Sequence, residues 1–356
     1  MKKGILASLL LFLFAGIGFG LTVVFSGTTD AVAGNKIALG RYLFYDTRMS
    51  YNLTKSCSSC HDPQFAFSDG YRTSSGADGY NVKRNAPSLI NIRYVAALTW
   101  ADSSIRNVEQ QMNFPLFNEH PRELGWKGHE QEILHRIAEV PMYRKLFQQV
   151  FPGEPQPVTR GNIIRAIAAF EEQLVSFDAP YDRYLRGNKQ ALSAAAVRGM
   201  QLFYSAELAC GSCHIWQSAK QPAQQPAVYY NTGLYNLDEE GAYPEEDQGL
   251  YEYTKNKADK GKFRVPSLRN VMLTAPYTHN GSVASVHEML RIYQRGGRSI
   301  ASGAFKGDGA ANMHKSPLVK GFDLSEADRL ALVAFLNSLT DSTYLNKSDL
   351  MNPFNQ

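Results

Sequence analysis

Two stretches of the chain repeat apolar residues at the three- and four-residue spacing of a helix face. The first stretch consists of Ile163, Ile164, Ile167, Phe170 and Leu174. The second consists of Leu332, Phe335, Leu336 and Leu339. Ser325 and Asp328 precede the second stretch at the spacing of a capping box, so we expect a helix to begin there. Strand-like alternation is scarce, and the pattern therefore predicts a mainly α-helical protein.

The most apolar segment covers residues 5–25, follows two lysines and precedes Ala31-Val32-Ala33. A positive start, an apolar run and a small-x-small site are typical of a secretory signal peptide, here residues 1–33, cut before Gly34. An uncut membrane anchor is the alternative, because a membrane span needs about 20 residues and the apolar run at 5–25 is that long. In both cases the rest of the chain is expected to fold in the periplasm, with membrane contact only if the leader stays uncut.

The length of 356 residues predicts about two domains. We expect them at 34–190 and 191–345, with a junction near 187–194 and a tail at 346–356. Residues 216–262 are rich in Gln, Pro, Tyr and Gly and predict a long ordered loop. The net charge is only +4, without a basic stripe, so nucleic acid is not an expected partner.

All four cysteines lie in two short motifs, Cys57-Ser58-Ser59-Cys60-His61 and Cys210-Gly211-Ser212-Cys213-His214. The pattern C-x-x-C-H attaches c-type haem: the two thiols bond to the porphyrin and the histidine binds the iron. A zinc site would require the two cysteine pairs to meet and would leave the histidines unused. A pair of redox dithiols would be expected in a βαβ context, which the pattern lacks. The sequence therefore predicts two haem c groups.

Several further phrases make the chain resemble the bacterial di-haem cytochrome c peroxidase and MauG family. They are LGRYLFYD at 39–46, HDP at 61–63, FSDG at 67–70, RNAPSL at 84–89, AIAAF at 166–170, FRVPSLRN at 263–270 and TAPYTHNGS at 274–282. The resemblance implies two cytochrome-c-like helical domains. Each domain would bind one haem covalently, and the two haems would face a shared interface.

By this resemblance, the haem at His61 is the peroxide site and keeps an open coordination position. Classical members cap this iron with a loop histidine, but here Ala77 stands at about that place. The family residues that help to cleave the O–O bond correspond to Gln111, Pro115 and Glu123. His120 is the alternative acid–base residue.

The resemblance also assigns the second haem a protein ligand on each side. His214 is the first, and Tyr293 stands where MauG-like members place a tyrosine. Met289 is the alternative, because peroxidases that receive electrons from small cytochromes use methionine. Tyrosine coordination would favour a high-valent di-haem state.

Three further groups correspond to family positions around and between the haems. Trp100 corresponds to the indole that bridges them. A calcium ion would be bound by Asn85, Thr274 and Pro276, the last two through backbone carbonyls. Arg264 and Arg269 would pair with haem propionates.

The implied function is oxidation of an exported partner protein with hydrogen peroxide, by modification of an aromatic side chain. A peroxidase supplied with electrons by a small redox protein is the second hypothesis, and a non-catalytic electron-transfer cytochrome is the third. MauG itself has a surface tryptophan at the position of Leu208. Trp216 or Trp126 could replace it as the exit for electron transfer.

Overall fold

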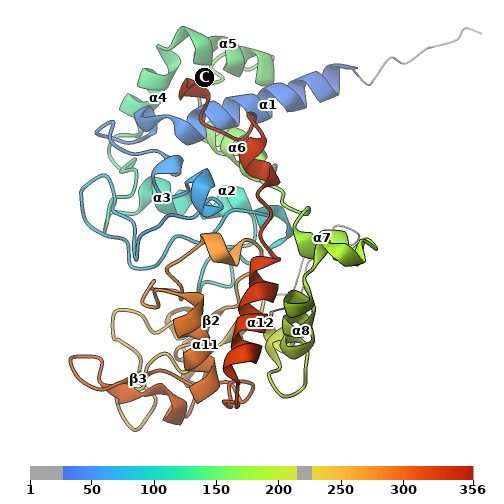
Figure 1. The fold of residues 1–356 in the computed structure, drawn as a ribbon. Helices are drawn as coiled ribbons and strands as arrows, with labels where there is room; N and C mark the ends of the chain where they lie inside the picture. Colours follow the sequence, from blue (N-terminus) through green and yellow to red (C-terminus); the bar gives the residue numbers. More distant parts are fainter. Residues whose placement is uncertain (1–26, 215–226, 356) are drawn as a thin grey trace, which may run out of the picture.

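The computed structural model describes residues 27–214 and 227–355, and they form a mainly helical molecule (Figure 1). The apolar run at 5–25 lies outside the described residues. The expected cleavage site, Ala31-Val32-Ala33, lies in the first turns of helix α1 (Gly27–Tyr45). None of the helices within these two ranges is long and apolar enough to cross a membrane.

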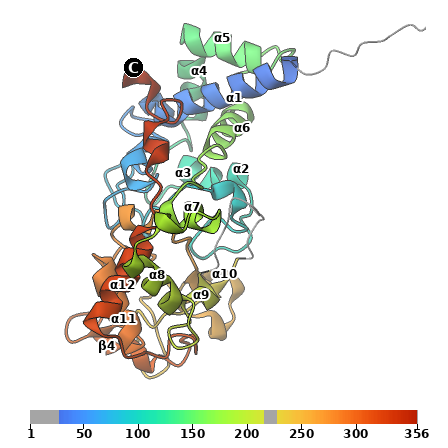
Figure 2. The same ribbon diagram turned by 45° about the vertical axis from the view of Figure 1, so that its right-hand side comes forward.

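Short helices predominate after α1. The others are α2 (Val108–Gln111), α3 (Asn113–Phe117), α4 (Glu130–Ala138), α5 (Pro141–Val150), α6 (Arg160–Glu171), α7 (Pro180–Leu185), α8 (Ala194–Phe203), α9 (Cys210–Cys213), α10 (Tyr251–Thr254), α11 (Val286–Arg295) and α12 (Glu326–Asn337). Strand β1 (Tyr229–Tyr230) pairs antiparallel with β2 (Phe263–Arg264), and β3 (Ser299–Ile300) with β4 (Gly307–Asp308). Figures 1 and 2 show α1–α6 in one lobe, here the N-terminal lobe, and α8–α12 in the other, the C-terminal lobe, with α7 between them.

The two helices predicted from apolar spacing are present. Helix α6 covers most of the first stretch, and Leu174 lies beyond its end but is fully buried. Helix α12 begins as expected, since the Ser325 hydroxyl accepts a hydrogen bond from the Asp328 N–H at 3.1 Å. Within the predicted loop, the described residues from 227 onward hold little regular structure beyond β1 and α10.

Each lobe is built around one crossing of two helices, α1 with α6 and α8 with α12 (Figures 1 and 2). A glycine stands at the point of closest approach in both. A Cβ atom on Gly40 would lie 1.9 Å from the Ala166 carbonyl oxygen, and one on Gly199 would lie 1.9 Å from that of Ala331. Only a residue without a Cβ fits so close to a backbone. The two lobes therefore repeat the same packing.

The repeat extends to three aromatic rings beside each crossing. In the N-terminal lobe they are Phe44, Tyr45 and Phe170. In the C-terminal lobe they are Phe203, Tyr204 and Phe335. In both lobes the first phenylalanine ring lies 5.1 Å from the tyrosine ring and 5.2 Å from the second phenylalanine ring, between centroids. We call each set an aromatic triad.

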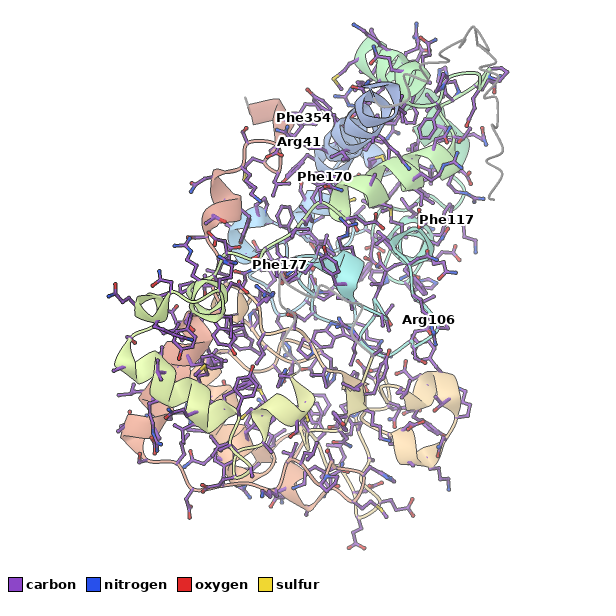
Figure 3. The ribbon with its side chains drawn as sticks, turned by 90° about the vertical axis from the view of Figure 1, so that its right-hand side faces the viewer. Arg41, Arg106, Phe117, Phe170, Phe177 and Phe354 are labelled. Carbon is purple, nitrogen blue, oxygen red and sulfur yellow. The ribbon has the colours of Figure 1, made fainter. Side chains whose placement is uncertain are left out.

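The C-terminal segment returns to the N-terminal lobe after α12 (Figure 1). The Tyr45 hydroxyl donates a hydrogen bond to the Leu350 carbonyl at 2.7 Å, and Arg41 Nε donates to the Met351 carbonyl at 2.7 Å. Phe354 follows, close to Arg41 in Figure 3. Tyr45 is therefore covered by the end of its own chain.

Candidate haem sites

In the first C-x-x-C-H motif, one ring nitrogen of the histidine already makes a hydrogen bond. His61 Nδ1 lies 2.8 Å from the Phe67 carbonyl oxygen. A carbonyl only accepts, so Nδ1 carries the hydrogen and Nε2 keeps a free lone pair for a metal. Burial also lowers the pKa of His61, which favours the neutral ring. Positive φ angles at Ala66 and Phe67 turn the chain back toward the histidine.

The second motif repeats this arrangement in the C-terminal lobe. Its cysteines form the single turn of α9, and His214 Nδ1 donates to the Pro266 carbonyl at 3.2 Å. Burial again lowers the pKa of the histidine. Both histidines thus present Nε2 as metal ligand, which fits iron coordination in two c-type haems.

The surroundings of the four cysteines favour neither a metal cluster nor reactive thiols. Burial raises the pKa of each of them, to about 11 for Cys60 and Cys210. Reactive thiols have a lowered pKa. Over residues 27–214 and 227–355, His, Cys, Asp and Glu side chains form no group of three that could hold a metal ion. The zinc and dithiol alternatives are therefore not supported.

A cavity in the C-terminal lobe brings the residues of the second haem site together. Cys210, His214, Met289 and Tyr293 all line it. Tyr293 comes from α11, and its hydroxyl has no hydrogen-bond partner in the described part of the chain. Burial and the nearby Cys210 and Cys213 raise the pKa of this phenol. Both candidate second ligands, Tyr293 and Met289, therefore line the cavity that contains the second attachment motif.

The same cavity reaches the residues predicted between the haems. Trp100 lines it, and the indole N–H donates to the Asn85 carbonyl at 2.8 Å. Asn85, Thr274 and Pro276 also line it. No described donor reaches the carbonyl oxygens of Thr274 and Pro276. Two carbonyl oxygens without partners, lining the same cavity as Asn85, fit calcium chemistry.

The two arginines predicted to pair with haem propionates differ in their hydrogen-bond partners. Arg264 is half-buried, its guanidinium donates only to the backbone carbonyls of Thr99 and Val265, and it has no carboxylate partner among the described residues. A haem propionate would neutralise it. Arg269 is instead held by Asp182 through two hydrogen bonds of 2.7 and 2.9 Å. Its guanidinium carbon lies 4.3 Å from the ring centroid of Phe177. Figure 3 shows Phe177 between the two lobes.

Glu123 lies on the side of the first attachment motif. Its negative charge contributes to the raised pKa of Cys60. Burial raises the pKa of the Glu123 carboxyl, although the Asn118 amide donates to it at 3.1 Å. The Ala77 N–H donates to the Glu123 carbonyl at 3.0 Å, and the Leu124 N–H donates to that of Pro115 at 2.9 Å. The loop position that holds a capping histidine in classical members thus adjoins Glu123.

Other predicted residues lie apart from this group. Gln111 ends α2 half-buried, and its side chain makes no hydrogen bond within the described ranges. His120 is exposed and lines an open groove near His279. Trp126 is fully buried, and its indole N–H donates a hydrogen bond to the Met49 carbonyl. The prediction that it could serve as a surface exit for electron transfer is therefore wrong. Trp216 lies outside the described residues.

The sequence reasoning missed three residues with a clear place at these sites. Phe67 and Pro266 supply the carbonyls that orient the histidines, and Glu171 is a buried carboxyl near Cys57. Phe67 and Pro266 stand inside the phrases FSDG and FRVPSLRN, which was the available signal. Glu171 directly follows an apolar helix face and carries no such signal.

Comparisons with known proteins agree with this geometry. The di-haem cytochrome c peroxidase family profile matches residues 34–190. Cytochrome-c peroxidase IdrP1 of Pseudomonas sp. (strain SCT) is 33% identical over 343 residues, which cover 89% of this chain and 84% of that protein. Methylamine utilization protein MauG of Methylorubrum extorquens is 30% identical over 305 residues, covering 85% and 78%.

A solved structure is also similar over nearly the whole chain. The crystal structure of a MauG-like protein associated with microbial copper homeostasis has 41% sequence identity and a TM-score of 0.86, covering 90% of this chain and 93% of that one. The chain therefore belongs to the di-haem cytochrome c peroxidase and MauG family of peroxidase-type oxidoreductases, a family defined by two haems.

Proposed function

We propose that this protein is an exported MauG-like enzyme that uses hydrogen peroxide to oxidise an aromatic side chain of an exported partner protein. The observation that carries the proposal is the half-buried Tyr293 side chain, which lines the cavity that also holds His214 and whose hydroxyl has no hydrogen-bond partner among the described residues. A phenolate is a hard anionic donor, which favours higher oxidation states of iron than a methionine sulfur does.

Bound at the two motifs, the haems would supply the reduction of peroxide and the storage of oxidising equivalents. The chain's own residues do the rest. His61 and His214 would hold the irons through Nε2, each oriented by a backbone carbonyl. Glu123 would take a proton from one peroxide oxygen and return it to the other, a step helped by its raised pKa. Trp100, fixed by Asn85, would lie in the path between the sites.

Two further assignments belong to the same proposal. Asn85, Thr274 and Pro276 would bind one calcium ion beside Trp100, and Arg264 would pair with a propionate of the second haem. Ala77 stands where classical members have the capping histidine, and this replacement supports an iron that reacts with peroxide without prior reduction.

A second candidate function is reduction of peroxide to water with electrons from a small redox protein. The presence of Met289 in the same cavity favours it, one helical turn before Tyr293. The name of the IdrP1 relative also points in this direction. The two functions differ in which side chain binds the second iron.

The test is addition of hydrogen peroxide to the diferric holoprotein, followed by visible and near-infrared absorption without any reductant. We expect both haems to change and a near-infrared band to form. Tyr293→Met should keep both haems, measured by mass, but lose that band. Glu123→Gln should slow the first reaction by about 10²- to 10⁴-fold, the usual contribution of a proton-transferring group.

Two results would overturn the proposal. One is a wild-type protein that needs prior reduction before it reacts with peroxide. The other is a Tyr293→Met variant with the spectrum of the wild type, which would leave the phenol without a role at the iron. A Met289→Leu variant serves as the matched control, because it changes the neighbouring wall of the cavity and should preserve the band.

A further inference from the structure

The two aromatic triads have the same geometry but differ in what covers their tyrosine. Tyr45 is only 7% exposed, and its hydroxyl donates to the Leu350 carbonyl of the returning C-terminal segment. Tyr204 occupies the corresponding place in the C-terminal lobe and is 45% exposed. Within the described residues, the C-terminal lobe has no segment that covers Tyr204 as Leu350 covers Tyr45.

Tyr204 also touches the loop that attaches the second haem. A Cβ atom on Gly211, between the two cysteines of the motif, would lie 2.5 Å from Tyr204 Cδ1. The ring therefore packs directly on the attachment loop. Its neighbour Phe203, 5.1 Å away between centroids, lines the cavity with His214 and Tyr293. One tyrosine thus contacts the haem-binding loop on one side and solvent on the other.

We infer that Tyr204 is the surface residue through which the second haem site oxidises the partner, a protein that presents an oxidisable aromatic side chain. This inference rests on the proposed function and names the surface residue through which electrons pass between the partner and the second haem site. Tyr204 replaces Trp126, which is buried. Aromatic rings are suited to this role, because they can lose and regain an electron without a change of fold.

The step balances with hydrogen peroxide as the oxidant. Tyr204 gives one electron inward to the second haem site and its phenolic proton to water. The Tyr181 hydroxyl donates to the Tyr204 oxygen at 3.4 Å, which leaves the Tyr204 hydrogen free to point toward solvent. The neutral phenoxyl radical then regains one electron from the partner's side chain and one proton from water. Two such transfers, with two protons, reduce one hydrogen peroxide to two water molecules.

The test traps the radical in the holoprotein without any partner. Hydrogen peroxide is added with a nitroso spin trap, and tandem mass spectrometry locates the adduct while absorption follows the haems. We expect the adduct on Tyr204. Tyr204→Phe should lose it and still show the peroxide-induced changes at both haems, whereas Tyr204→Trp should restore an adduct at this position.

Tyr253→Phe is the matched control, because Tyr253 is 46% exposed but belongs to α10. This variant should keep the adduct on Tyr204. An adduct on Trp216 or Tyr253 instead, with normal haem changes, would overturn the assignment of Tyr204 alone. Absence of haem changes in the wild type would overturn the proposed function, so the two failures are distinguishable.

Discussion

Glu171 is a carboxyl group in the core of the N-terminal lobe. It is 5% exposed, and its Oε2 atom has no hydrogen-bond partner among the described residues. Burial, with the charge of Glu172, raises the pKa of Glu171 to about 8. Its negative charge in turn contributes to the raised pKa of Cys57, so the group lies on the side of the first haem. A neutral carboxyl at this place avoids a buried charge without a counterion.

The raised pKa predicts a pH dependence of stability. An unfolded glutamate titrates near 4.3, so between about pH 4.3 and pH 8 the folded state binds a proton that the unfolded state has lost. The contribution of Glu171 to the free energy of unfolding is therefore full below about pH 4.3 and is lost as the pH rises to 8. Glu171→Gln should raise the melting temperature of the holoprotein more at pH 8 than at pH 5.

The control for this measurement is Glu172→Gln, which keeps most of the wild-type pH dependence because burial, the larger cause, stays. If the melting temperatures of the wild type and Glu171→Gln differ by the same amount at every pH from 5 to 8, this would contradict a protonated Glu171.

At the scale of elements, the two helix crossings explain the position of their glycines. In α1 and α8 the backbone passes so close to the partner helix that a side chain has no room. Glycine costs about 1 kcal/mol relative to alanine inside a helix. The closer packing must therefore outweigh that cost at Gly40 and Gly199.

Gly40→Ala and Gly199→Ala should each destabilise the holoprotein by about 1–3 kcal/mol, the usual cost of overpacking. Thermal or denaturant unfolding measures the change. Gly161→Ala is the control, because Gly161 lies in α6 and a Cβ atom there would meet no atom of another segment within 4 Å. This variant should be neutral or slightly more stable than the wild type. Equal stability of Gly40→Ala and Gly161→Ala would refute the close crossing.

At the scale of the whole molecule, contacts between distant segments join the lobes. Arg84 donates two hydrogen bonds to Asp247, at 2.7 and 2.9 Å. The Asn85 N–H donates to the His279 carbonyl at 2.8 Å. Such contacts bring the candidate calcium residues, which are far apart in the sequence, to one cavity. The C-terminal segment adds a second connection, through Leu350 and its neighbours.

Leu350→Ala should destabilise the protein by about 2–5 kcal/mol, as expected for a buried leucine in a packed contact. Leu350 is 4% exposed, whereas Leu330 on α12 is 52% exposed and offers a control that should change stability by less than about 0.5 kcal/mol. Nitration of Tyr45, measured by mass spectrometry, should increase in Leu350→Ala. If Tyr45 stays protected and stability is unchanged, the segment does not cover the lobe as described.

The chemistry of haem attachment and the helices around it could be predicted from the amino-acid sequence. Cys57, Cys60 and His61 are near neighbours along the chain, as are their counterparts at 210–214, so the motif is local and readable. The faces of α6 and α12 were equally local, because helical spacing appears within a few turns. The family resemblance also implied Tyr293 and Glu123 as residues of the two sites, and their roles stay predictions.

Features that depend on distant contacts emerged only from the folded chain. Folding assigned the Phe67 and Pro266 carbonyls to the histidines, engaged Arg269 with Asp182 and buried Trp126. It also covered Tyr45 and left Tyr204 open, although both follow the same Leu-Phe pair in the sequence. The physical reason is that burial and hydrogen-bond partners are set by which segments fold over a residue, and that information is not carried by its neighbours along the chain.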